Sequence, residues 1–415
     1  MLNIKSFKSK LNNPFISLKH KNFRYYWLGM CVSLIGTWMQ NIAQPWLAYS
    51  LTKSPFLLSL ITALQFTPVL LFSLFAGDII DKFSKKKILI FTQSASMVIT
   101  FVLAVLVLTG EIRYWHLVVL ATILGIVNTL DMPARQTIVI ELVGKEDLMN
   151  AIALNSTVFN LARIVGPAIA VVVMANSGVS VCFFINSFSF GAVLISLFFI
   201  KFKSVQIKPH ENIKILSNIK DGLKYIYNNE VLFDTLIVVA IVGTFAPNFG
   251  VLVPVFVKEI LKQKVAGYGF LMSLLGIGSL IGAIFIATIS RSGPKKIILY
   301  IVPLFVGAFL ICTGFTNSLI ICGIFLIITG FFFVSFSSNA NSAMQLNTSN
   351  EYRGRVMSVY SLVFAGSTPI GSLYAGIITD RFNARIGFAA CGGITILLMV
   401  LLYLFKLNKV NKKLH

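Results

Sequence analysis

Apolar runs long enough to cross a bilayer repeat along almost the whole chain, separated by short polar segments. A transmembrane helix needs roughly 20 apolar residues, and a segment exposed to lipid must be helical because its backbone groups find no other partners there. In the first half the predicted spans cover residues 24–51, 56–80, 88–108, 116–137, 150–174 and 179–200. In the second half they cover residues 231–257, 268–290, 297–316, 318–342, 356–379 and 386–405. The pattern predicts an all-α membrane protein with about twelve transmembrane helices.

A basic stretch interrupts this pattern in the middle of the chain. It divides the sequence into a six-helix bundle over residues 1–200, a cytoplasmic linker over 201–230 and a second six-helix bundle over 231–415. Apolar residues recur at three-to-four spacing between Ile215 and Tyr227, which predicts an amphipathic helix in the linker. Gly125, Glu146 and Gly166 fall on the same residue types about 205 positions later. This weak repeat favours two pseudo-symmetric bundles with a substrate site between them.

Composition and charge agree with a membrane protein. Only 12% of the residues are charged, whereas a soluble domain carries roughly a quarter. If both termini are cytoplasmic, 27 of the 35 Lys and Arg residues fall in cytoplasmic segments and 7 fall outside. This asymmetry follows the positive-inside rule. We therefore expect a multi-pass protein of a bacterial-type cell membrane with cytoplasmic termini, and we attribute the net charge of +21 to topology rather than to nucleic-acid binding.

The loop after the second predicted span carries the sharpest motif, GDIIDKFSKK over residues 77–86. Glycine lets two helices approach closely, and a carboxylate can lie at the N-terminus of a neighbouring helix. The adjacent cations can then build a charge network that forms in one gate state and breaks in the other. The alternative is that these cations only fix the topology. The candidate gating residues in this loop are Gly77, Asp78, Asp81, Lys82, Lys85 and Lys86.

This motif resembles the Gly-x-x-x-Asp-(Arg/Lys)-x-Gly-(Arg/Lys)-(Arg/Lys) signature of the major facilitator superfamily, with Ser84 where that family usually has glycine. The resemblance implies the major facilitator fold of two six-helix bundles. It also implies that Arg135 joins Asp81 and Lys82 in the gate network. A loop after the tenth predicted span is similar to the second-half pattern of the same family, and it adds the gating candidates Glu351, Arg353 and Arg355.

Further segments of the first half look like the branch of that superfamily that includes the bacterial enterobactin exporter. They read RYYWLG at 24–29, GTWMQ at 36–40, LTKSP at 51–55 and DMPARQ at 131–136. The branch implies a secondary transporter that exports small amphipathic compounds, siderophore- or drug-like, by alternating access and proton antiport. An importer or a lipid-handling transporter of the same fold is the alternative.

One cation stands deep inside a predicted span. Arg163 lies roughly 20 Å from the cytoplasmic end of its helix at a rise of 1.5 Å per residue, and an intramembrane charge is costly and by default functional. On a helical wheel it shares a face with Ser156, Asn160, Gly166 and Pro167, so we expect this face to line the central cavity. Arg163 either holds an anionic substrate group or a carboxylate partner, or it is a structural arginine bonded to carbonyls of a kinked helix.

Other polar residues in the spans are weaker candidates. Gln40, Asn41 and Gln44 in the first span and Asn248 in the seventh should face the cavity or a neighbouring helix, because amides are costly against lipid. Interhelical hydrogen bonding is the alternative. Asp131 is a candidate for proton coupling, although a local ion pair with Arg135 is the plainest interpretation.

The sequence offers little for catalysis. The four histidines are widely spaced, the five cysteines lack metal-ligand spacing, and no phosphate-binding loop occurs. We therefore expect no enzyme activity, no catalytic residue, no metal and no cofactor. The expected partners are a small-molecule substrate, the lipid bilayer and a coupling ion, H⁺, with no nucleic acid, and the expected state is a monomer.

Overall fold

The computed structural model describes residues 14–200, 215–289, 293–349 and 351–414, and the regular structure in these ranges is helical. The first half contains η1 (Ile16–Lys19), α2 (Lys21–Thr52), α3 (Pro55–Lys82), α4 (Lys85–Leu108), α5 (Tyr114–Val143), α6 (Leu148–Ser177) and α7 (Val179–Phe199). The short helix α8 (Ile215–Tyr227) follows. The second half contains α9 (Glu230–Phe245), α10 (Phe249–Glu259), α11 (Val265–Ile289), α12 (Lys296–Tyr300), α13 (Val302–Phe315), α14 (Leu319–Leu346), α15 (Arg353–Arg381) and α16 (Ala384–Leu414).

The number of membrane crossings agrees with the prediction of about twelve. In the described ranges, eleven segments are long and apolar enough to cross a membrane, with α9 and α10 forming one crossing and α12 and α13 another. The remaining long helix, α2, is less apolar because its middle carries the amides of Gln40, Asn41 and Gln44. It is 32 residues long and packs against α6 and α7. It supplies the twelfth crossing, so the predicted fold class is confirmed.

Two crossings predicted as continuous helices are interrupted near proline. α9 gives way to α10 around Pro247, whose nitrogen carries no hydrogen to donate. The side chain of Asn248 donates to the carbonyl of Thr244 (2.9 Å), so it occupies an acceptor that the broken helix leaves without its usual backbone partner. α12 likewise ends shortly before Pro303.

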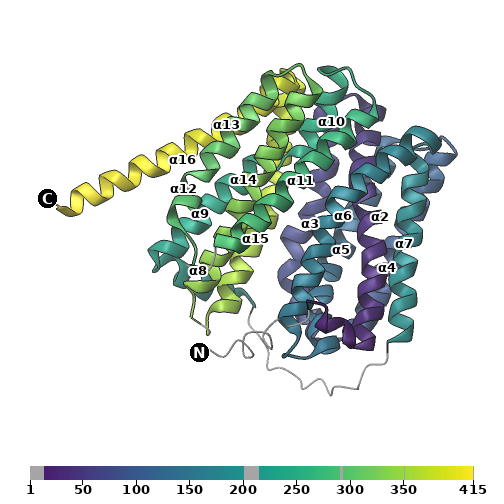
Figure 1. The fold of residues 1–415 in the computed structure, drawn as a ribbon, viewed down its shortest axis with the longest axis horizontal. Coiled ribbons are helices and arrows are strands. Elements are labelled where there is room, and N and C mark those ends of the chain that lie inside the picture. The colour runs from purple at the N-terminus through teal and green to yellow at the C-terminus, as the bar shows by residue number, and fades with distance from the viewer. Residues whose placement is uncertain (1–13, 201–214, 290–292, 350, 415) are drawn as a thin grey trace, which may run out of the picture.

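The two halves repeat the same packing plan. In the first half α3 packs on α5, α4 on α7 and α2 on α6; in the second half the equivalent pairs are α11 with α14, α13 with α16 and α9 with α15. Figure 1 shows the first half, purple to teal, beside the second, green to yellow, with the long axes of most helices roughly parallel. The chain therefore forms two pseudo-symmetric six-crossing bundles.

The sequence repeat coincides with close helix crossings. A side chain at Gly125 would collide with the backbone of α3, and one at Gly330, its repeat partner, would collide with the backbone of α11. Gly166 lies tightly against α2, and its repeat partner Gly371 lies tightly against α9. Glycine at these positions lets the backbones approach, as is common between transmembrane helices. The weak repeat thus marks two equivalent close helix crossings in each bundle.

The linker contains the predicted amphipathic helix. Residues 201–214 lie outside the described residues, and α8 follows them. α8 packs against α15, with Ile226 buried and the ring of Tyr225 stacked on that of Tyr352 (centroids 4.5 Å apart). The helix is therefore attached to the second half. The domain limits 1–200, 201–230 and 231–415 stay a prediction.

Candidate transport site and gates

The two ends of the bundle differ in how the halves meet. We call the end with the starts of α2 and α6, at the bottom of Figure 1, the basal end, and the end with the start of α3 and the end of α10 the distal end. The halves meet along α3 with α15 and along α6 with α11. Gly376 lies against Ser59 near the distal end, and Gly366 lies against Leu70 near the middle of α3.

Hydrogen bonds join the halves at the distal end. The Tyr49 hydroxyl on α2 donates to the carboxylate of Glu259 on α10. The Ser54 hydroxyl, at the start of α3, donates to Asp380 Oδ1 on α15 (2.7 Å). The backbone N–H of Phe56 donates to the same oxygen (3.3 Å), so this carboxylate lies at the positive N-terminal end of α3.

A lysine adds to this distal contact. Lys258 Nζ, next to Glu259 on α10, lies 5.6 Å from the ring centroid of Trp46 and 5.4 Å from that of Tyr49, both on α2. It also donates to the Ser50 hydroxyl (3.3 Å). These contacts place a cation of the second half over two aromatic rings of the first, a favourable arrangement for both.

At the basal end, the ion pairs of the described residues join groups of the same half. Lys85 pairs with Glu141 (3.4 Å) between α4 and α5. Asp147, just before α6, pairs with Lys19 (2.9 Å) and His20 (2.7 Å). The hydrogen bonds from Lys19 and His20 hold the pKa of the Asp147 carboxyl below its usual range. Each half is thus tied together at its own basal end.

Two further ion pairs lie in the second half. Arg355 on α15 lies 3.5 Å from Asp221 on α8, and its guanidinium stands 5.4 Å from the Tyr352 ring centroid. Lys406 on α16 pairs with Asp234 on α9, which also accepts from the Tyr300 hydroxyl (2.9 Å). The first pair links α8 to α15, and the second group of contacts links α9, α12 and α16.

The structure separates the predicted gating residues into different environments. Lys86 donates to the backbone carbonyl of Ile200 at the end of α7 (2.8 Å). Lys82, Glu351 and Arg353 are exposed. The side chains of Asp78 and Asp81 and the surroundings of Gly77 lie outside the described part of the chain.

Asp131 and Arg135 form the local ion pair. Arg135 Nε donates to Asp131 Oδ2 (2.6 Å), one helical turn away on α5. The other carboxylate oxygen of Asp131 accepts from Thr92 and Gln93 on α4, both at 2.6 Å. Asp131 is buried, and its carboxylate accepts hydrogen bonds from three donors. The predicted contact of Arg135 with Asp81 and Lys82, and the proton-coupling role of Asp131, stay predictions.

The amides of the first crossing build an interhelical chain. Gln40 accepts from Asn186 on α7 (2.6 Å) and donates to Gln44 (3.2 Å). Gln44 in turn donates to Gln65 on α3 (3.0 Å). Gln40 and Gln44 are buried, whereas Asn41 is exposed. The hydrogen bonds of Gln40 and Gln44 therefore match the interhelical interpretation. Buried Asn248 instead donates to the Thr244 and Phe245 carbonyls of its own crossing.

Helix α6 has two exposed faces of opposite character. One face carries the exposed aliphatic side chains of Leu161, Val165 and Val172, which suit contact with lipid. The other, which we call the α6 polar face, carries Ser156, Phe159, Asn160 and Arg163. Gly166 and Pro167, expected on that face, are buried in the packing instead. The polar face lies between the contacts of α6 with α2 and with α11.

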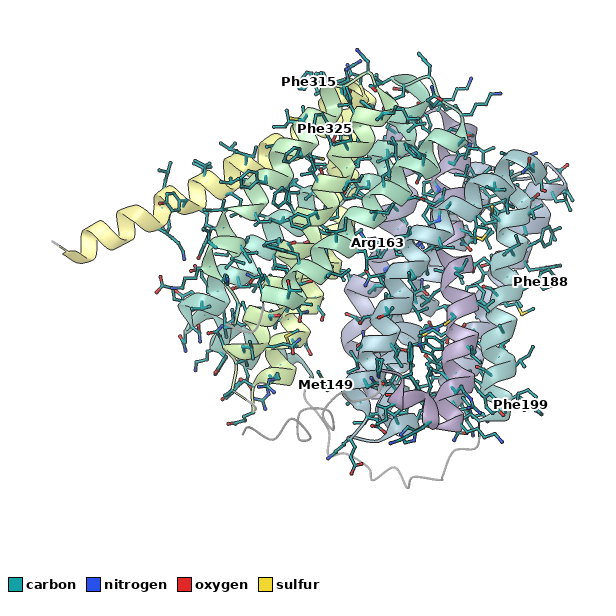
Figure 2. The ribbon with its side chains drawn as sticks, in the orientation of Figure 1. Met149, Arg163, Phe188, Phe199, Phe315 and Phe325 are labelled. Atoms are coloured by element: carbon teal, nitrogen blue, oxygen red, sulfur yellow. The ribbon has the colours of Figure 1, made fainter. Side chains whose placement is uncertain are left out.

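Arg163 lies midway along the bundle, where the two halves meet (Figure 2). Gly276 of α11 packs against its backbone carbonyl. Its guanidinium stands 5.6 Å from the ring centroid of Trp38 on α2. The same ring meets Phe159 edge-on, with centroids 5.6 Å apart. A cation and two aromatic rings thus come together from α2 and α6.

Sequence reasoning missed the distal contacts. The segment LTKSP, which contains Ser54, indicated only a family resemblance. The carboxylate partners of Tyr49 and Ser54 are 210 and 326 residues away in the chain. A carboxylate at the end of a predicted span, in a protein with only 14 acidic residues, was the one available signal.

The fold and the paired halves define a secondary transporter of the major facilitator type rather than an enzyme. The family model described as transmembrane secretion effector matches residues 12–414, and the chain belongs to this family. The chain is 25% identical to the staphyloferrin A transporter of Staphylococcus aureus, over 94% of this chain and 96% of that protein. It is 24% identical to the multidrug efflux pump Tap of Mycolicibacterium fortuitum, over 86% and 88%. Macrolide efflux protein A of Streptococcus pyogenes is 22% identical, over 94% and 96%.

Solved structures share the fold at lower identity. A POT family transporter in complex with 5-aminolevulinic acid superposes with a TM-score of 0.76 at 12% identity, covering 93% of this chain and 96% of that one. A bacterial homologue of the human lysosomal transporter Spinster, in an inward-facing and unoccupied conformation, gives 0.71 at 11% identity, covering 92% and 94%. These likenesses establish the architecture alone.

Proposed function

We propose that this protein is a monomeric exporter of small amphipathic compounds in a bacterial cell membrane, working by alternating access and proton antiport. Transport by a secondary mechanism follows from the family. Export is supported by relatives whose names describe efflux of drugs and macrolides. The basal end is assigned to the cytoplasm because the basic residues concentrate there.

The observation that carries the proposal is the unequal closure of the two ends. With the basal end cytoplasmic, the Tyr49–Glu259 and Ser54–Asp380 bonds close the extracellular side. A substrate then reaches the α6 polar face from the cytoplasm. Rocking of one half against the other breaks these distal bonds and exposes the same face to the outside.

We assign the predicted residues to this cycle by their environments. Asn41, Asn160 and Arg163 are the substrate-binding candidates, because their side chains are exposed or half-buried. Gln40 and Gln44 hold helices together. The predicted gating loops would meet at the basal end when the distal end opens.

Asp131 remains the candidate for proton coupling. A motion that separates Arg135 from Asp131 would leave a buried carboxylate without its cation, and such a group readily takes up a proton.

Counterflow in proteoliposomes tests the proposal. A panel of siderophores, macrolides and dyes is followed with and without an imposed pH gradient. We expect gradient-dependent flux of at least one compound, abolished by Asp131→Asn and retained by a Lys145→Gln control. Flux that runs only in the import direction would favour the importer alternative, and the absence of flux for every compound would remove support for export.

A further inference from the structure

Arg163 differs from the other arginines that are held by specific contacts. The Arg135 and Arg355 side chains each have a carboxylate within 3.5 Å, and Arg385 donates to the Gly314 carbonyl (3.2 Å). Among the described residues, no hydrogen bond or ion pair reaches the side chain of Arg163. Its guanidinium instead makes a cation–π contact with the Trp38 ring. A guanidinium can donate five hydrogen bonds, so its donors stay available.

The position of this guanidinium excludes the role of a loop cation that only fixes the orientation of the protein in the membrane. It lies near the middle of a 30-residue helix, far from the headgroup region where a long side chain could reach water. It lies on the face of α6 opposite to the aliphatic strip of Leu161, Val165 and Val172. Placing an unpaired cation at this depth is costly unless a negative charge arrives during function.

Apolar surface surrounds the cation. Phe159 stands one turn before Arg163 on α6 and is 45% exposed, so its ring is only partly used by its contact with Trp38. Trp38 touches both residues and is itself half-buried. A bound compound would therefore meet aromatic faces directly beside a cation.

We infer that the transported compound carries an anionic group of the carboxylate class, which pairs with Arg163 while an adjacent ring or apolar chain packs on Phe159 and Trp38. The planar guanidinium matches a carboxylate with two parallel hydrogen bonds. This inference rests on the proposed function, since it takes the α6 polar face to be the substrate site. It narrows the cargo from amphipathic compounds in general to amphipathic anions.

Binding of matched acids and esters tests this inference. The purified protein in lipid nanodiscs is dialysed to equilibrium against 2-naphthylacetate, 1-pyrenebutyrate and fluorescein, and against the methyl ester of each, with empty nanodiscs correcting for partition into lipid. We expect at least one acid to bind about tenfold more tightly than its ester, as expected for a charge-assisted pair. Equal binding of every acid and its ester, or no binding of any acid, would overturn the inference.

Substitutions locate the preference. Arg163→Gln should remove the acid preference and leave ester binding unchanged, whereas Arg163→Lys should keep part of it. Arg24→Gln, which removes an exposed arginine at the start of α2, is the charge-matched control and should change nothing. An acid preference that survives Arg163→Gln would contradict the assignment. If this variant does not fold, Arg163→Lys and the wild-type acid and ester comparison still decide. Counterflow of the same acids separates the two ideas, because anion binding without flux would contradict export alone.

Discussion

At the distal end the halves are bonded to each other, whereas at the basal end the described ion pairs lie within one half. Tyr49 and Ser54 reach carboxylates of the second half, while Lys85 and Asp147 pair inside the first. Contacts inside a half move with it and survive a rigid-body rotation. Contacts between halves must break in each cycle, so they have to be weak.

The strength of the distal contacts suits this requirement. A hydrogen bond contributes roughly 0.5–1.5 kcal/mol, or about 1.5–3 kcal/mol where one partner is charged, and about 1.4 kcal/mol changes a two-state population tenfold. A few such bonds can hold the distal end closed in the absence of cargo and still yield when a substrate binds the other state more tightly. The two ends therefore differ in whether their polar contacts join the two halves, and not in the residue types that form these contacts.

The largest effect should come from making a distal contact permanent. Ser54→Cys with Asp380→Cys replaces a cross-half hydrogen bond (2.7 Å between the side-chain oxygens) by a disulfide. We expect oxidation to abolish counterflow and reduction to restore it, because the halves can no longer separate at that end. Mass spectrometry would verify the cross-link, in a background with exposed Cys312 replaced by serine.

A cross-link within one half is the matched control. Asn317 and Arg385 lie in contact at the same end, both in the second half. Because the arginine side chain that makes this contact is long, the Asn317→Cys and Arg385→Cys pair is joined with a short bifunctional thiol reagent, and transport should be largely retained. Loss of transport in both cross-linked proteins would mean that any cross-link at the distal end is harmful, whether it lies within one half or between the halves.

An intermediate effect is expected from removing the Tyr49 hydroxyl. Tyr49→Phe keeps the ring under Lys258 and deletes the bond to Glu259. Hydrogen bonds to charged groups contribute more than neutral ones; allowing for partial exposure, about 1 kcal/mol corresponds to a roughly fivefold larger open population. Alkylation of a Ser59→Cys reporter, buried at the cross-half contact with Gly376, should accelerate by a similar factor.

Tyr114→Phe provides the comparison for this measurement. Tyr114 also donates its hydroxyl, to the Leu57 carbonyl (3.0 Å), within the first half. Labelling of the reporter should stay at the wild-type rate in this variant. Equal acceleration in both variants would assign the effect to looser packing of the first half rather than to the gate.

The sequence predicted the fold more completely than the site for a physical reason. A bilayer fixes the length and polarity of each crossing, so most predicted span limits lie within a few residues of the helix ends. The exceptions are α5 and α16, which end six and nine residues beyond the predicted limits 137 and 405. The sequence also identified Arg163 and the repeated glycines Gly125 and Gly330. The cost of a charge in the membrane and the small size of glycine are properties of a single residue, so they need no knowledge of its partners. The Tyr49–Glu259 bond was not, since it depends on how two separately folded halves meet. The amides stayed ambiguous until their partners were known.

The smallest effect is expected at the basal end, from Asp147→Asn. Asp147 is held ionised by Lys19 and His20, and its pKa is lowered in the folded protein. A lowered pKa means that this contribution to stability is complete above the ordinary carboxyl pKa and is lost as the pH falls through the folded value. At pH 7 the variant should therefore melt slightly below the wild type, and the gap should close in strong acid. Because the contact lies within one half, alkylation of Ser59→Cys should be unchanged; a clear acceleration would show that basal contacts also bias the gate.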